Sequence, residues 1–153
     1  MITVRVATEH DAEILARFMT ELNEAVGADG LPPPLDRARD SVKVSREQMQ
    51  RRLRASAAVE TELIAEVDGA PMGFVAVRVV PYLGQEVPYA EVTQLYVTPW
   101  QRRLGVALTL MREAESFAIA RGCTAVHVFV VTSNADARAV LHGCRVPTAI
   151  RRA

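Results

Sequence analysis

The stretch Gln94-Leu-Tyr-Val-Thr-Pro-Trp-Gln-Arg-Arg-Leu-Gly-Val-Ala-Leu-Thr-Leu110 decides the fold, because it joins a strand to a helix through a short turn. The apolar strand ends at Val97, where a Thr-Pro pair stops it. Gly105 and Ala107 then open an amphipathic helix, whose first backbone N–H groups have no partner within the helix. A helix start of this kind, with the pair Arg102-Arg103 beside it, is suited to bind phosphate groups.

Before this stretch the sequence predicts a strand, two helices and a loop. Residues 2–7 alternate apolar and polar side chains, as a half-buried strand does. Residues 8–26 carry apolar side chains at helical spacing behind a threonine cap. A loop rich in glycine and proline covers residues 27–43, and a second helix begins at Ser45 and runs to about Ala57. The arginines of this second helix are expected to face solvent.

Three strands follow the second helix. Residues 62–67 and 71–80 form a hairpin around the tight turn Asp68-Gly69. A loop of residues 81–88 leads to the strand 89–97, which enters the opening stretch.

The last part of the chain predicts a helix, a central strand and a short helix. The helix from the opening turn ends at Gly122, which sits where a C-terminal cap belongs. Residues 124–131 are apolar on both faces, residues 134–141 form a short helix, and the tail after Pro147 adds one short strand. The order is β-α-α-β-β-β-α-β-α with a final β, a mixed α/β fold in a single domain of residues 1–153.

Composition narrows the possible functions. With 153 residues and 50% hydrophobic content, the chain builds one domain with a substantial core. Its 18 basic and 18 acidic side chains cancel, so nothing in the net charge favours nucleic acid or a membrane surface. Cys123 and Cys144 lack the spacing of a zinc or redox site, and the three histidines have no metal-ligand spacing. We expect a cytoplasmic protein with no metal.

Two motifs resemble those of the GCN5-related N-acetyltransferases (GNAT). Arg102-x-x-Gly105-x-Ala107 resembles the family's acetyl-coenzyme A signature, and Asn134-x-x-Ala137 resembles its Asn-x-x-Ala motif. The order of elements matches the family over nearly the whole chain. The resemblance implies a mixed, mostly antiparallel central sheet flanked by helices, and makes a homodimer plausible. The sequence departs from the family at Leu141, where a tyrosine usually stands, and at Arg145-Val146, which replaces Gly-Phe.

The resemblance also implies where acetyl-CoA binds. The backbone of residues 104–108, with the two arginines, holds the pyrophosphate, while the backbone of residues 95–97 pairs with the pantetheine arm and supplies an oxyanion donor. The implied cofactor-binding residues are Leu95, Tyr96, Val97, Arg102, Arg103, Leu104, Gly105, Val106, Ala107, Leu108, Asn134 and Ala137. The structural alternative is an ordinary strand-to-helix crossover whose small residues allow close packing.

Three residues are candidates for the proton transfers. Glu91 lies six residues before Val97, where the resemblance places a catalytic glutamate. Burial among apolar neighbours would raise its pKa toward the operating pH, as a general base requires, whereas a salt-bridged glutamate would be structural. Because Leu141 stands where the family usually has a tyrosine, His142 and Tyr96 are the candidates for the group that protonates the leaving thiolate. The alternative is that His142 is a surface residue and Tyr96 a core residue.

The sequence therefore predicts an N-acetyltransferase. A primary amine, expected to be a small molecule, attacks acetyl-CoA directly in a ternary complex, without an acyl-enzyme. The alternatives are a protein N-terminal or lysine acetyltransferase, and a catalytically weak acyl-CoA-binding regulatory module. We expect the acceptor to be selected by the first two predicted helices, together with the loops of residues 27–43 and 81–88.

Overall fold

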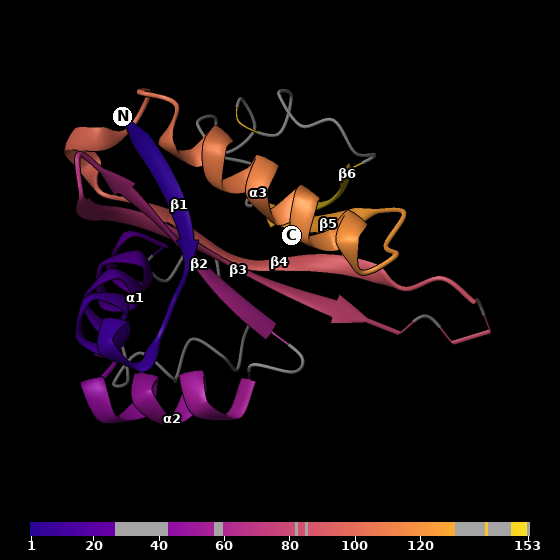
Figure 1. The fold of residues 1–153 in the computed structure, drawn as a ribbon, viewed down its shortest axis with the longest axis horizontal. Helices are drawn as coiled ribbons and strands as arrows, with labels where there is room; N and C mark the ends of the chain where they lie inside the picture. The colour runs from indigo at the N-terminus through magenta and orange to yellow at the C-terminus, as the bar shows by residue number, and fades with distance from the viewer. Residues whose placement is uncertain are drawn as a thin grey trace.

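A computed structural model describes residues 1–26, 43–56, 60–81, 83–84, 86–130, 140 and 148–152, and shows one sheet with helices on both faces (Figure 1). Six strands are hydrogen-bonded in the order in which they occur in the chain: β1 (Ile2–Val6), β2 (Glu60–Val67), β3 (Ala70–Val80), β4 (Tyr89–Val97), β5 (Val126–Val130) and β6 (Thr148–Arg152). The pairs from β1 to β4 are antiparallel, whereas β4–β5 and β5–β6 are parallel.

Two layers of helices cover this sheet. On one face lie α1 (Ala12–Val26), which follows the 3₁₀ turn η1 (Glu9–Asp11), and α2 (Arg46–Ser56); on the other lies α3 (Val106–Ala120), which follows the 3₁₀ turn η4 (Pro99–Gln101). None of the helices in these parts of the chain is both long and apolar enough to cross a membrane.

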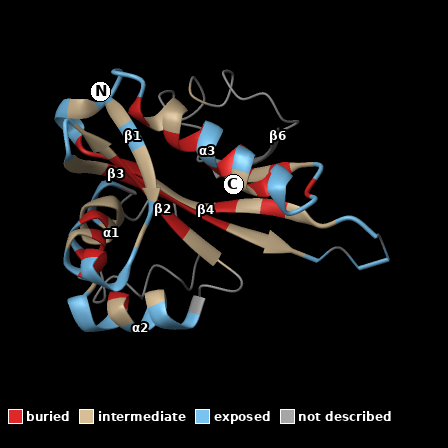
Figure 2. Cartoon of the chain, viewed as in Figure 1, coloured by how far each residue is buried: buried red, intermediate tan, exposed pale blue. Residues whose placement is uncertain are grey.

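Alternation along the strands builds a separate apolar core on each face, as the buried positions in Figure 2 show. Leu63, Val75 and Val77 point to the α3 side, where they pack with Leu110 and Met111. Their neighbours in sequence point the other way, into the core formed with the first two helices. That second core contains Leu15, Phe18, Met49, Ile64, Phe74 and Tyr96.

Local chemistry accounts for the predicted helix starts and the hairpin. At the start of α2, the Ser45 backbone N–H donates to Gln48 Oε1 at 2.7 Å and the Gln48 N–H donates to Ser45 Oγ at 3.1 Å, which is a capping box. Between β2 and β3, Asp68 and Gly69 both adopt positive φ, 50° and 83°, as a two-residue hairpin turn requires. Both predictions are confirmed.

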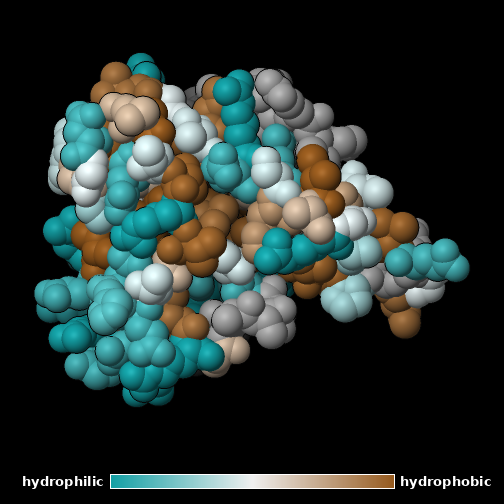
Figure 3. Space-filling model, viewed as in Figure 1, coloured by the Kyte–Doolittle hydropathy of each residue, from teal (hydrophilic) through white to brown (hydrophobic). Residues whose placement is uncertain are grey.

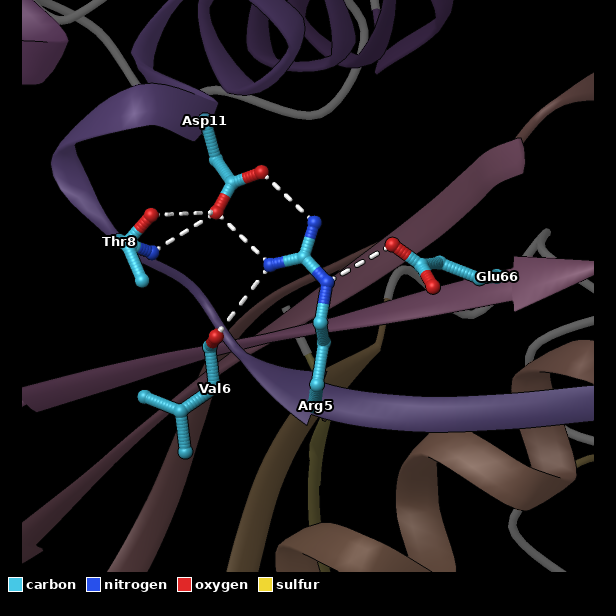
Figure 4. Close-up of polar contacts among 5 residues, drawn as sticks. All are labelled: Arg5, Val6, Thr8, Asp11 and Glu66. Carbon is cyan, nitrogen blue, oxygen red and sulfur yellow. Dashed lines mark hydrogen bonds and ion pairs between the residues drawn. The ribbon is translucent and has the colours of Figure 1, made fainter. Parts of the chain in front are cut away.

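A polar cluster fixes the corner where β1 leads into α1 (Figure 4). The Arg5 guanidinium donates to both carboxylate oxygens of Asp11 at 2.8 Å and to Glu66 at 2.7 Å. The Thr8 backbone N–H donates to the same Asp11 carboxylate at 2.8 Å. Together, led by the hydrogen bond from Arg5, these donors lower the pKa of Asp11 from 3.8 to about 2.

Most of the predicted elements are present within one or two residues of their expected bounds. The predicted helix of residues 134–141 lies outside the described residues, apart from Val140, which is helical. The arginines of α2 are exposed, as expected, and two of them also form ion pairs. Arg52 pairs with Glu60 and Glu62 of β2, and Arg54 pairs with Glu9 at 3.1 Å, so these two side chains join α2 to neighbouring elements.

Candidate functional site

The turn between β4 and α3 is held by contacts to the strands beneath it. Thr98 is fully buried, and its N–H donates to the Met72 carbonyl at 2.9 Å. Arg102 folds back so that its Nε donates to the Val97 carbonyl at 3.1 Å. The turn is therefore anchored to the end of β4, the strand that the sequence placed in the site.

The N-terminus of α3 opens onto free space. Gly105 caps the helix with φ of 88°, a conformation that side chains with a Cβ rarely adopt. A Cβ built on Gly105 would meet no atom of the described residues within 4 Å. The next side chain, Val106, is buried in the core and so fixes the first turn of the helix. Because the first N–H groups of a helix attract anions, this geometry fits a phosphate group.

Strands β4 and β5 separate halfway along β4. Their register runs from Ala90 opposite Val126 to Val92 opposite Val128, and no later pair joins the described residues of the two strands. Thr93 follows at once and is a bulge, because β3 pairs Val77 with Val92 and the adjacent Ala76 with Gln94. The remainder of β4 therefore runs on without β5 beside it.

A cavity of about 380 Å³ lies between α1, α2 and the sheet. Its apolar side is contributed mainly by the helices, and its polar side by α2, β2 and β4. The lining residues are Leu15, Met19, Lys43, Val44, Gln48, Met49, Arg52, Glu62, Phe74, Ala76 and Gln94. The cavity thus reaches β4 at Gln94, directly after the bulge.

A row of polar residues crosses the sheet on the face that the cavity occupies. Glu60, Arg78, Glu91 and His127 are successive register partners on β2 to β5, so their side chains share that face. Arg78 Nη2 donates to both Glu91 oxygens at 3.2 Å, and the Glu91 side chain is 14% exposed. The His127 ring stacks on Tyr89, with ring centroids 4.4 Å apart. Glu91 is thus a salt-bridged carboxylate with an imidazole as its register neighbour, and the salt bridge is what the structural alternative expected.

A second row lies next to the first. Glu62, Ala76 and Gln94 are register partners on β2, β3 and β4, and all three line the cavity. Arg52 of α2 reaches down to this face, where its Nη2 lies 2.8 Å from Glu60 and its Nε lies 3.0 Å from Glu62. The hydrophilic surface over α2 is visible in Figure 3.

Tyr96 packs its ring in the core and directs its hydroxyl toward α1. The ring lies 5.3 Å from that of Phe18, and the hydroxyl donates a hydrogen bond to Glu21. Burial, followed by that bond, raises the pKa of Tyr96 to about 12. The Tyr96 ring thus lies in the core, as the alternative to the proton-donor role expected.

The structure brings part of the predicted site together. Residues 95–97 and 102–108 form one continuous strand, turn and helix start, and Glu91 lies on the strand that leads into it. Asn134, Ala137, Leu141 and His142 lie outside the described residues. Among the residues that the structure does describe, no group of three or more His, Cys, Asp or Glu side chains is placed to hold a metal ion.

Sequence reasoning did not single out two lining residues of the cavity, Glu62 and Gln94, because they are ordinary polar positions on strands. Arg52 was predicted only as one of the solvent-facing arginines of its helix. The one local signal was the alternation of strand β2, which puts a carboxylate on the face that also carries Ile64.

Comparisons with known proteins agree with this geometry. The family model described as "Acetyltransferase (GNAT) family" matches residues 31–144. No curated protein matches the chain significantly in sequence.

Many solved structures share the fold. One is a PaiA N-acetyltransferase from Thermoplasma acidophilum in complex with coenzyme A, with a TM-score of 0.71, 20% identity and coverage of 93% of this chain and 87% of the other. Another is an aminoglycoside acetyltransferase from an uncultured soil metagenomic sample in complex with sisomicin, with a TM-score of 0.70, 16% identity and coverage of 92% and 85%.

A third is a ribosomal-protein-alanine N-acetyltransferase from Brucella melitensis biovar Abortus 2308, with a TM-score of 0.67, 20% identity and coverage of 92% of this chain and 87% of that one. At these identities the likeness shows the fold alone. The family model, by contrast, spans most of the chain, and it matches the part that contains the α3 turn, the separated strands and the lining residues of the cavity other than Leu15 and Met19. This chain belongs to the acetyltransferase (GNAT) family.

Proposed function

We propose that this chain transfers an acetyl group from acetyl-CoA to a primary amine of a small molecule, by direct attack in a ternary complex. The proposal rests on the position at which the cavity reaches the sheet. It reaches β4 at Gln94, next to the bulged Thr93 and just beyond the last β4–β5 pair. An acceptor in the cavity would therefore meet a donor that lies along the separated part of β4.

The donor side of this proposal rests on the helix start. The N–H groups of residues 104–108, together with Arg102 and Arg103, would hold the pyrophosphate of acetyl-CoA, and the open space at Gly105 leaves room for it. The backbone of residues 95–97 would bind the pantetheine arm and supply an oxyanion donor. Acetyl-CoA, when bound, supplies the activated acetyl thioester. No covalent intermediate on the protein is needed.

Glu91 is our candidate for the group that takes the proton from the acceptor amine. Arg78 orients its carboxylate, and His127 lies beside it in the same row. The cavity's described lining does not include Glu91, so we propose that the proton reaches it through water. Tyr96 and His142 stay our candidates for protonating the leaving thiolate. The Tyr96 hydroxyl would have to exchange its bond to Glu21 for that role.

The cavity supports a small acceptor over a protein. Its volume of about 380 Å³ lies within the range of small-molecule sites, and its walls come from two helices and the sheet. Acetylation of a protein N-terminus or lysine is the alternative of the same class. A cytoplasmic location and a homodimer also belong to this proposal; light scattering of the purified protein tests the dimer.

The test is release of free CoA thiol from acetyl-CoA over a panel of primary amines. We expect turnover with at least one small amine, and we expect Glu91→Gln to lower kcat about a hundredfold while the affinity for CoA is unchanged. Glu113→Gln, at an exposed position on α3, is the matched control and should leave kcat unaltered. If CoA binds but no amine is acetylated, the protein is an acyl-CoA-binding module instead.

A further inference from the structure

The end of β4 is paired on one side only. Among the described residues, β5 pairs with β4 no further than Val92. On the other side β3 runs beside β4 to its end, where Gly73 lies opposite Val97 (Figure 1). The Thr98 N–H then donates to the Met72 carbonyl at 2.9 Å, and Thr98 is fully buried. Met72 and Gly73 of β3 therefore set where the end of β4 lies.

Gly73 allows the two strands to approach closely. A Cβ built on this buried residue would lie 2.5 Å from the Tyr96 carbonyl oxygen and 3.2 Å from Val97 Cα. Both atoms belong to the backbone, so neither can turn aside as the end of a flexible side chain can. Because a real Cβ stays more than 3.0 Å from such atoms, any larger residue would push the strands apart by about 0.5 Å or more.

The other neighbour of β3 decides which strand would move. β2 pairs Ala65 with Gly73, and Glu66 with Pro71. Met72 is therefore an extra residue, a β-bulge that bends β3 toward the end of β4. Since β3 is fixed by β2 while the end of β4 has no described strand on its far side, β4 would yield. It would move into the gap along which we propose that acetyl-CoA lies.

We propose that Gly73 is a positioning residue for the acetyl donor. By letting β3 approach β4, it places the backbone of Tyr96 and Val97 where the pantetheine arm binds, and it acts through that backbone. This inference rests on the proposed function, since it assumes that the donor lies along the end of β4. A small shift is enough to matter, because a misplacement of about 1 Å can cost an enzyme about a hundredfold in rate.

The first experiment compares two ligands by calorimetry. Gly73→Ala should weaken CoA binding about tenfold, because the backbone that meets the pantetheine arm has moved. ADP carries the pyrophosphate without that arm. It should bind the variant as it binds wild type, because buried Val106 fixes the start of α3 in the core. An unchanged affinity for CoA would overturn the proposal, and so would an equal loss of affinity for ADP.

Val77→Ala is the matched control for Gly73→Ala. Val77 is fully buried on the same strand, but it lies opposite Val92, where β4 still pairs with β5. The substitution should lower stability, which urea unfolding measures, and leave CoA affinity within about twofold of wild type. If Val77→Ala weakened CoA binding as much as Gly73→Ala does, the effect would belong to stability and the proposal would fail.

Hydrogen exchange of the wild-type protein gives a test that holds even if Gly73→Ala does not fold. The Thr98 amide, which donates to Met72, should exchange as slowly without CoA as with it, because β3 positions β4 before the donor binds. Protection of this amide that appears only with CoA would overturn the inference.

These readouts separate the inference from the proposed function, because none of them measures acetyl transfer. If wild type binds CoA but acetylates no amine, the enzyme is rejected, and the CoA affinities of Gly73→Ala and Val77→Ala still decide the role of Gly73. If wild type binds CoA but not ADP, the proposed phosphate site is rejected and the same two affinities decide. Acetylation of an amine together with unchanged CoA binding in Gly73→Ala would keep the enzyme and reject the inference.

Discussion

Gly105 is the residue at which the turn after β4 becomes helix α3. Because Gly105 has a φ of 88° and open space beside it, a substitution there can test whether the start of α3 binds the phosphates of CoA. Asn and Asp tolerate this backbone region better than other side chains, cap helices equally well and have nearly the same shape. We predict that Gly105→Asp weakens CoA binding about tenfold more than Gly105→Asn, because only aspartate repels the phosphates. Calorimetry measures both affinities.

Thermal unfolding of the two Gly105 variants is the control for this comparison, and their midpoints should agree. Equal CoA affinities in Gly105→Asp and Gly105→Asn would show that the phosphates bind elsewhere. The interpretation of this stretch as an ordinary strand-to-helix crossover would then hold.

Residues whose role is set by local backbone geometry were predictable from sequence, and those defined by strand register were not. Gly105 and Gly122 both adopt positive φ where the sequence placed a turn and a cap. Glu62 and Gln94 meet in one cavity only because β2, β3 and β4 pair in one register. The bulge at Thr93 moves every later residue of β4 by one position relative to β3, and nothing in the local sequence announces it.

At the scale of elements, helix α2 is docked by both apolar and ionic contacts. Met49 enters the core, and Arg52, with a side chain 42% exposed, bridges Glu60 and Glu62. We predict that Arg52→Met lowers the free energy of unfolding by about 1–3 kcal/mol, because two poorly solvated carboxylates lose their partner; partial exposure of Arg52 keeps the loss below that of a fully buried pair. Urea unfolding measures the change.

The neighbouring arginine on α2 is the control for this loss. Arg51→Met removes the same charge from an exposed position and should change stability by less than about 0.5 kcal/mol. Equal effects of the two substitutions would mean that Arg52 contributes only its charge to the helix, and not its contacts to β2.

Periodicity predicted the elements well, while their contacts depended on packing. The alternation in β1 to β4 and the apolar stripe of α3 gave the correct types and nearly correct bounds. The ion pairs of Arg52 on the exposed face of α2 could not be predicted, because its partners lie on β2, beyond the reach of any helical pattern. The same limit applies to the η1 turn. There Arg5 of β1 binds the Asp11 carboxylate and is itself paired with Glu66 of β2.

At the scale of the whole molecule, two of the polar contacts among the described residues join the η1–α1 segment to the sheet. Arg5 of β1 binds Asp11 at the start of the helix, and Tyr96 of β4 binds Glu21 within it. The first contact needs an ionised carboxyl group and the second a protonated phenol. Stability should therefore decline in both acid and alkali, for two identifiable reasons.

On the acid side, the pKa of Asp11 is lowered from 3.8 to about 2 in the folded protein. Its contribution is therefore fully present above pH 3.8, and it is lost as the pH falls toward 2. We predict a loss of about 1–2 kcal/mol over this range, allowing for the partly exposed Arg5. Urea unfolding between pH 5 and pH 2 measures it. In Asp11→Asn this part of the decline should disappear, and an unchanged decline would contradict the assignment.

On the alkaline side, the sign is reversed, because burial raises the pKa of Tyr96 from 10.0 to about 12 and so favours the protonated phenol. The stabilisation is present below pH 10.0 and is lost as the pH rises toward 12. We predict that Tyr96→Phe unfolds more easily at neutral pH, since Glu21 loses its donor, yet loses less stability than wild type between pH 9 and pH 11. If the free energies of unfolding of the two proteins fall in parallel between pH 9 and pH 11, the Tyr96 hydroxyl ionises in the folded state as freely as in the unfolded chain.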